Sequence, residues 1–154
     1  MKLSEHFTLS EFTVSQTASR YGYDNTPGET EIASLRALAL NVLEPVRTQF
    51  GVPITISSGY RSLKVNKKVG GSSSSQHIKG EAADIQVWGY DPVTVFNWIA
   101  FYSGLDFDQV IQEFGSWVHV SFTERRPNRR IALRARKSGG KTIYDRITEP
   151  LDMV

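Results

Sequence analysis

Apolar residues recur every three to four positions between residues 26 and 51, which is the spacing of a helix with one buried face. Thr26 is the expected N-cap, with Pro27 at the first helical position and Glu29 completing a capping box. Pro45 is expected to bend or end the helix because proline has no backbone N–H to donate. The predicted buried face consists of Ile32, Leu35, Leu38, Ala39, Val42, Leu43 and Val46.

A second helix is predicted over residues 91–104, with Asp91 as N-cap, Pro92 behind it and Gly104 at its end. Elsewhere β-branched and apolar residues alternate with polar ones, which indicates strands. The predicted strands cover 52–59, 81–89, 107–114 and 117–122, the last two joined as a hairpin around Gly115–Ser116. These elements indicate an α+β fold with a small, mainly antiparallel sheet flanked by helices.

Length and composition indicate one domain over residues 1–154, since 154 residues with 40% hydrophobic content suit a single core. The start, MKLSEHFTLSEF, lacks the apolar stretch of a secretion signal, and no run is long enough to span a bilayer. We therefore expect synthesis in the cytoplasm without a signal peptide and no membrane insertion. The absence of cysteine excludes disulfides, thiolate metal sites and cysteine nucleophiles.

Charge is unevenly distributed along the chain. Residues 1–124 carry 9 Lys/Arg against 13 Asp/Glu, whereas the tail, residues 125–154, carries 9 against 3. A basic tail suits an anionic cell envelope or a nucleic acid, but no nucleic-acid-binding motif is present and we expect no such partner. The plainer interpretation is a solvated β-hairpin, because residues 129–137 and 142–148 flank the turn-like SGGK.

Without cysteine, a hydrolytic site needs an activated hydroxyl, paired carboxylates or a metal, and the three histidines narrow the choice. His6 is expected to be exposed or to cap a helix. His77 and His119 each lie beside a predicted strand, and the Lys79–Gly80 turn would let Asp84 meet His77. Two imidazoles and a carboxylate are donors that zinc accepts. The spacing alone is weak evidence for a metal site, because it often arises by chance and a hydrogen-bonded structural histidine is the more usual case.

The wider context is similar to a known family. SSGYRS at 57–62, Asn66, VGGSSSSQHIKGEAADI at 69–85 and WVHVS at 117–121 resemble the zinc D-alanyl-D-alanine peptidases and phage endolysin peptidases. These enzymes cleave peptidoglycan and share their zinc fold with the hedgehog signalling domain. Their signature, S-x-H-x-x-G-x-A-x-D and then W-x-H, is matched by Ser75, His77, Gly80, Ala82, Asp84, Trp117 and His119. The segment HFTLSEFTVSQTASRYGYDNTP at 6–27 and the RR…KSGGKTIY ending also resemble the phage branch, so the likeness covers nearly the whole chain.

The resemblance implies that His77, Asp84 and His119 bind one Zn²⁺. It leaves the general base open, because many relatives carry an acid three positions before the last histidine and this chain has Ser116 there. Glu113 is the nearest carboxylate, at a spacing that the hedgehog branch also shows. A three-residue loop, 114–116, would place Glu113 on the face of His119, whereas a two-residue turn would place it on the other. We expect the longer loop and assign Glu113 as the base; a salt-bridging surface glutamate is the alternative.

Arg61 is the candidate for binding a substrate carboxylate or stabilising an oxyanion, since its guanidinium offers two parallel donors. A structural arginine is the alternative. Three further residues are candidates for substrate contact. Ser75 could equally cap a turn, Trp117 could equally fill the core, and Tyr60 is expected to support the turn that carries Arg61.

Two functions follow from the resemblance. The first is a zinc peptidase, acting as a monomer on peptidoglycan stems or cross-links after host lysis or from a virion. The second is a non-catalytic zinc-containing module that binds peptidoglycan. A base at Glu113 beside a complete ligand set favours the enzyme.

Overall fold

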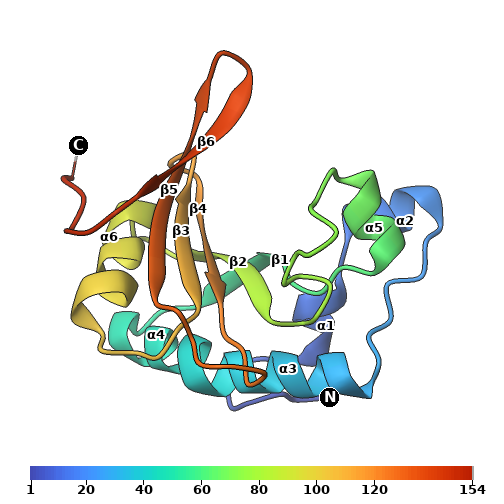
Figure 1. Cartoon of the computed structure of the whole chain (residues 1–154). Coiled ribbons are helices and arrows are strands. Elements are labelled where there is room, and N and C mark those ends of the chain that lie inside the picture. The colour runs from blue at the N-terminus through green and yellow to red at the C-terminus, as the bar shows by residue number, and fades with distance from the viewer. Residues whose placement is uncertain (154) are drawn as a thin grey trace.

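The computed structural model describes residues 1–153, and they form one sheet with helices around it (Figure 1). The helical elements are α1 (Leu9–Thr13), α2 (Gln16–Tyr21), α3 (Glu29–Leu38), the π-helical η1 (Ala39–Leu43), α4 (Glu44–Phe50), α5 (Leu63–Lys68), α6 (Pro92–Asn97) and the π-helical η2 (Trp98–Tyr102). The strands are β1 (Ile54–Ser58), β2 (Ala82–Val87), β3 (Gln109–Glu113), β4 (Trp117–Ser121), β5 (Ile131–Ser138) and β6 (Lys141–Arg146).

The six strands lie in the order β1-β2-β4-β3-β5-β6, and β3–β5 is the parallel pair among antiparallel ones. The predicted α+β class and mainly antiparallel sheet are confirmed. All four predicted strands form, as does the 107–122 hairpin. None of the helices within residues 1–153 is long and apolar enough to cross a membrane.

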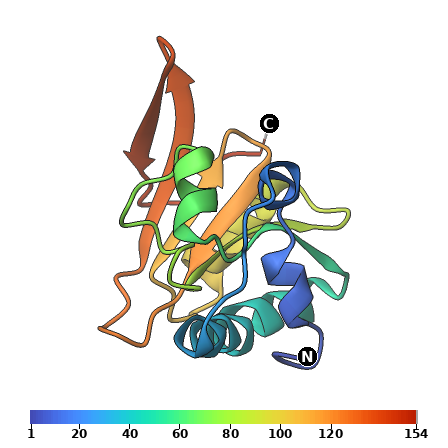
Figure 2. The same ribbon diagram turned by 90° about the vertical axis from the view of Figure 1, so that its right-hand side faces the viewer.

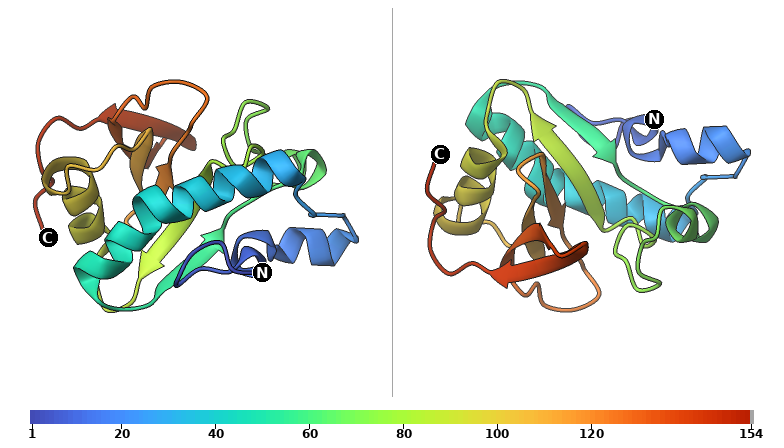
Figure 3. Two further views of the ribbon diagram at one scale, coloured as in Figure 1. Left: turned by 90° about the horizontal axis from the view of Figure 1, so that it is seen from below. Right: turned by 90° about the horizontal axis from the view of Figure 1, so that it is seen from above.

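The long helix predicted over residues 26–51 forms as α3, η1 and α4 in succession, and it runs beneath the sheet (Figure 3). Its predicted start was wrong by two residues. Gly28 is the N-cap, and its N–H donates to the carboxylate of Glu31 at 3.1 Å, because the hydroxyl of Thr26 already donates to Asp24 at 2.6 Å. The helix does not end at Pro45; a π-helical turn precedes it, and Pro45 occupies the first turn of α4.

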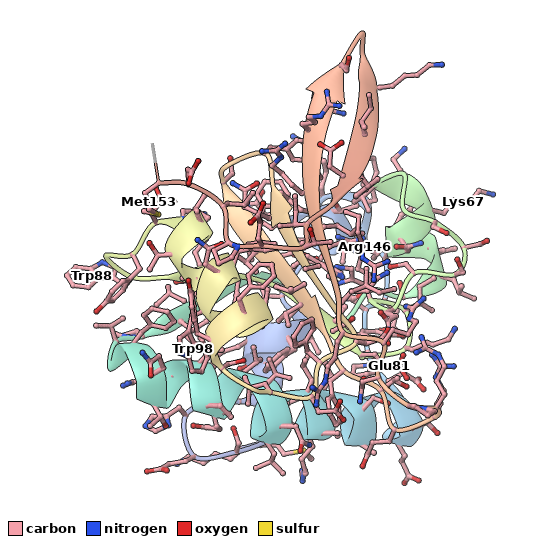
Figure 4. The ribbon with its side chains drawn as sticks, turned by 60° about the vertical axis from the view of Figure 1, so that its left-hand side comes forward. Lys67, Glu81, Trp88, Trp98, Arg146 and Met153 are labelled. Atoms are coloured by element: carbon pink, nitrogen blue, oxygen red, sulfur yellow. The ribbon has the colours of Figure 1, made fainter. Side chains whose placement is uncertain are left out.

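The sheet separates a core face from an open face, because successive side chains of a strand point to opposite sides. Ile85, Val110 and Val118 belong to the core, which continues into the buried face of α3, η1 and α4. Helix α6 and η2 close the same core, and Trp98 of η2 (Figure 4) is packed against it. The rings of Trp98 and Phe50 meet edge to face. Polar residues between these positions therefore lie together on the opposite face.

The C-terminal tail contains the predicted hairpin, formed by β5 and β6, which projects beyond the rest of the sheet (Figures 1 and 2). Gly139 and Gly140 at its tip have φ of 57° and 78°, in the left-handed region that tight hairpin turns require. Much of the tail's positive charge is paired. Arg134 and Arg136 contact Asp145, for example, at 3.5 and 2.7 Å.

Candidate active site

Two of the three predicted metal ligands face each other across neighbouring strands. Asp84 of β2 and His119 of β4 are paired in register, which places their side chains side by side on the open face. Nδ1 of His119 lies 3.0 Å from Oδ1 of Asp84. Strand pairing alone therefore brings together residues that are 35 positions apart in the chain.

The third predicted ligand, His77, lies in the loop before β2 and is 4% exposed. Its Nδ1–H donates to the carbonyl of Gly59 at 2.7 Å, which leaves Nε2 facing Asp84 at 3.5 Å. Gly80 lets the chain turn back, with φ of 70°, and a Cβ there would lie 2.5 Å from the carbonyl oxygen of Glu31. Only glycine fits this position, because the left-handed backbone and the approach to α3 both exclude a side chain.

Electrostatics favour an ionised Asp84 carboxylate and a neutral His77 imidazole. Burial opposes the charge of Asp84, but its contacts with His119 and His77 outweigh burial and hold the pKa of Asp84 well below its usual range. Burial is the largest influence on His77 and lowers its pKa, despite the neighbouring Asp84. Both groups are thus in the protonation states that bind metals at neutral pH.

This donor set fits a zinc ion. One donor atom from each of His77, Asp84 and His119 lies within 4.8 Å of the others. Tetrahedral zinc with bonds of about 2.0–2.1 Å needs donors about 3.3 Å apart, and the separations from Oδ1 of Asp84 are 3.0 and 3.5 Å. The Nδ1–H bond from His77 to a carbonyl is the outer contact that commonly orients a metal-binding imidazole.

Glu113 lies on the same face as the three ligands. The loop after it has three residues, as predicted, so Glu113 pairs with Trp117, and Oε1 lies 4.0 Å from Nδ1 of His119. Phe114 and Gly115 turn the chain with φ of 57° and 69°. Burial, followed by the negative charge of Asp84, raises the pKa of Glu113. The carboxylate is therefore a stronger base than an exposed glutamate.

Arg61 extends the same cluster. Its Nε donates to Oγ of Ser58 at 3.1 Å, and Nη2 lies 3.6 Å from Oδ2 of Asp84. Nη1 donates to Oδ1 of the buried Asn66 at 3.3 Å. The amide of Asn66 also donates to the carbonyl of Ser72 at 2.8 Å, so it joins Arg61 to the serine-rich loop. No role for Asn66 was predicted from the sequence, although its position among the matched motifs was a signal.

One open cavity of about 710 Å³ lies between the 70–77 loop and the open face of the sheet. It is lined by Arg61, His77, Asp84, Glu113 and His119. Ser75 and Trp117 line it as well; Ser75 also caps a turn, its Oγ accepting from the N–H of His77 at 3.2 Å. Tyr60 does not line this cavity. It is 9% exposed within the core, and its exposed edge borders a separate hollow beside α3.

Several other residues of the cavity wall were not predicted from the sequence. Arg125, Arg126 and Arg129 line it from the segment between β4 and β5, and Leu133 and Tyr144 line it from the hairpin. From the sequence, these arginines were expected to lie in a solvated basic tail. Their contact with the site depends on the parallel β3–β5 pairing, for which the sequence carries no local signal.

His6 belongs to another group that could hold a cation, with Glu5 and Glu44. Its Nδ1 lies 2.6 Å from Oε1 of Glu44, whose Oε2 accepts from the hydroxyl of Ser4 at 2.6 Å. The carboxylate is thus already hydrogen-bonded within the chain. His6 remains 37% exposed, as expected for a residue outside the active site.

Comparison with known proteins agrees with this geometry. The zinc D-Ala-D-Ala carboxypeptidase of Streptomyces albus G is 39% identical over 84 residues. The aligned stretch is 52% of this chain and 31% of that protein, so this chain matches less than a third of its relative. The family model described as peptidase M15 matches residues 5–121, which include all three ligand positions and Glu113. The chain belongs to the peptidase M15 family.

Proposed function

We propose that this protein is a zinc-dependent peptidase that hydrolyses peptide bonds in peptidoglycan stems or cross-links. The single observation that carries the proposal is the position of Glu113, whose carboxylate lies 4.0 Å from His119, beside a complete set of three zinc donors in an open cavity. Membership of the M15 family and the similarity to a zinc D-Ala-D-Ala carboxypeptidase support it.

His77, Asp84 and His119 would hold the zinc ion, and three protein ligands leave a fourth position for water or substrate. When bound, zinc acidifies water and polarises a carbonyl group. Glu113 takes a proton from the attacking water as oxygen adds to the peptide carbon, and gives it to the amine nitrogen as the C–N bond breaks. Its raised pKa suits both transfers.

Arg61 would bind the negative oxygen that forms at the carbonyl, or a carboxylate of the substrate. Ser58 and Asn66 hold its guanidinium in place before substrate arrives, which reduces the entropy lost on binding. Ser75 and Trp117 would contact the peptide, since both line the cavity.

We further propose an endolysin-like role in a phage or prophage, as a monomer with the fold of hedgehog-type and D-Ala-D-Ala peptidases. The resemblance of residues 6–27 and of the RR…KSGGKTIY ending to the phage branch supports that role. The serine- and glycine-rich 70–75 loop supports a polymeric substrate, because small side chains leave one wall of the cavity open.

The test combines metal analysis with mass spectrometry of purified peptidoglycan after digestion. The wild-type protein should bind one zinc per chain and release fragments whose new termini identify the bond cut. The His77→Ala variant should lose both the zinc and the fragments, whereas His6→Ala, at an exposed histidine outside the cavity, should keep both.

Normal digestion by zinc-free His77→Ala would refute the proposed site. A wild-type protein that binds zinc and sediments with peptidoglycan but releases no fragment would instead be the non-catalytic binding module.

A further inference from the structure

The segment between β4 and β5, residues 122–130, carries four arginines, and we name it the arginine loop. Arg125, Arg126 and Arg129 line the cavity that holds His77, Asp84 and His119. Arg130 does not line it; its Nε lies 3.4 Å from Oδ1 of the exposed Asp106. Three guanidinium groups therefore face the substrate cavity, in addition to Arg61.

Two buried carboxylates hold these three arginines. Glu81, 2% exposed at the base of the sheet (Figure 4), accepts from Nε and Nη2 of Arg125 at 2.7 and 2.8 Å. Asp108, fully buried, accepts from Nη1 of Arg126 at 2.7 Å and from Nη2 of Arg129 at 2.8 Å. Each guanidinium is thus held by hydrogen bonds to a buried carboxylate, while the rest of the group stays partly exposed.

Hydrogen bonds also hold the backbone of the arginine loop in place. The side-chain oxygen of Asn128 accepts from the N–H of Thr123 at 2.9 Å, and its amide donates to the carbonyl of Thr123 at 3.1 Å. The N–H of Arg129 donates to Asp108 at 3.0 Å. A ligand that binds here would not have to order the loop, which lowers the entropy cost of binding.

Charge and free donors identify the class of ligand. Three guanidiniums face two carboxylates, which leaves one net positive charge on this wall. Nη1 of Arg125 and Nη1 of Arg129 have no hydrogen-bond partner within residues 1–153. The side chains of Arg125 and Arg129 are 50% and 44% exposed, so the free nitrogens can reach a ligand in the cavity. A planar guanidinium group with free N–H donors matches the geometry of a carboxylate.

We propose that the arginine loop is a second anion subsite, which binds a carboxylate of the substrate peptide away from the bond that is cut. The proposal rests on the proposed peptidase function and adds to it a preference for acidic peptides. If the arginines had only a structural role, the nitrogens that donate to Glu81 and Asp108 would be sufficient. The free Nη1 nitrogens of Arg125 and Arg129 would then bind nothing.

The test uses two synthetic stem peptides, one with a free carboxylate on its glutamate and one with that group converted to a carboxamide. The zinc-loaded wild-type protein should cleave the acidic peptide with kcat/KM about tenfold higher, as expected for a charge-assisted hydrogen bond. Arg129→Gln should reduce that ratio to about twofold or less. Arg130→Gln, which removes a charge from the same loop outside the cavity, should keep the wild-type ratio.

Equal kcat/KM for the two peptides with the wild-type protein would overturn the subsite, as would an unchanged ratio in both Arg129→Gln and Arg125→Gln. Thermal unfolding checks that each variant is folded, since Asp108 retains Arg126 when Arg129 is replaced. If neither peptide is cleaved, calorimetry decides the subsite, and the proposed function fails only if purified peptidoglycan is not digested either. Wild-type protein that binds both peptides with the same Kd would then refute the subsite.

Discussion

At the scale of single residues, burial sets the chemistry of Glu113. Its side chain is 17% exposed and lies next to His119, so burial and the charge of Asp84 raise its pKa. Trp117 is its cross-strand partner, and the influence of the indole N–H lowers the pKa of Glu113 by less than burial raises it. The raised pKa makes the Glu113 carboxylate a better acceptor for the proton of an attacking water.

Replacing Glu113 with Gln should leave zinc bound and reduce kcat by about 10²- to 10⁴-fold, the range expected for loss of a general base. The amide keeps the shape of the side chain but cannot take the proton. Zinc per chain by mass spectrometry and turnover of peptidoglycan provide the two measurements. Glu124→Gln, at an exposed position of the arginine loop that does not line the cavity, is the matched control and should behave as wild type. Full activity in the Glu113 variant would place the base elsewhere.

At the scale of elements, the β5–β6 hairpin extends the cavity wall. Ala135 pairs with Glu113 on one side and with Tyr144 on the other, so the open face continues from Glu113 into the hairpin. The N–H of Phe114 also donates to the carbonyl of Ala135 at 3.1 Å. The hairpin therefore supports the loop that fixes the direction of Glu113.

Replacing Gly140 with Ala should loosen the hairpin, because a Cβ at φ of 78° costs about 1–2 kcal/mol. Hydrogen exchange of the amides in 131–146 should become faster, while exchange in α3 stays unchanged. Gly139→Asn is the matched control, since Asn-Gly suits this turn and should preserve protection. If the amides in 131–146 exchange as slowly in both variants as in the wild-type protein, the conformation of the tip does not limit the stability of the hairpin.

Elements with a clear repeat were predictable from sequence, and contacts between distant elements were not. The 117–122 strand and its three-residue loop follow from alternation and turn length, and they correctly placed Glu113 on the face of His119. Helices α1, α2 and α5 have only five or six residues, too few for a periodic signal, and were not predicted. Arg125 and Glu81 are 44 positions apart in the chain, so the local sequence pattern around either residue carries no signal of their contact.

At the scale of the whole molecule, Glu81 and Asp108 tie the arginine loop to the sheet. Burial by itself would raise the pKa of each carboxyl, but hydrogen bonds from Arg125 to Glu81, and from Arg129 and Arg126 to Asp108, outweigh it and lower both. A depressed pKa in the folded state stabilises the protein above the unfolded-state pKa of about 4. That stabilisation is lost as the pH falls through this value toward the folded-state pKa.

The Asp108→Asn variant should therefore be less stable than wild type by about 3 kcal/mol near pH 7, because it breaks a buried ion pair. The difference should shrink between about pH 5 and pH 2, since the unfolded wild-type chain takes up a proton at Asp108 while the folded chain does not. Urea unfolding of both proteins at each pH measures the gap, and the metal site, identical in both, cancels. Asp106→Asn, at a 57% exposed partner of Arg130, should differ little from wild type throughout. A gap that stays constant with pH would mean that the charge of Asp108 contributes nothing to the fold.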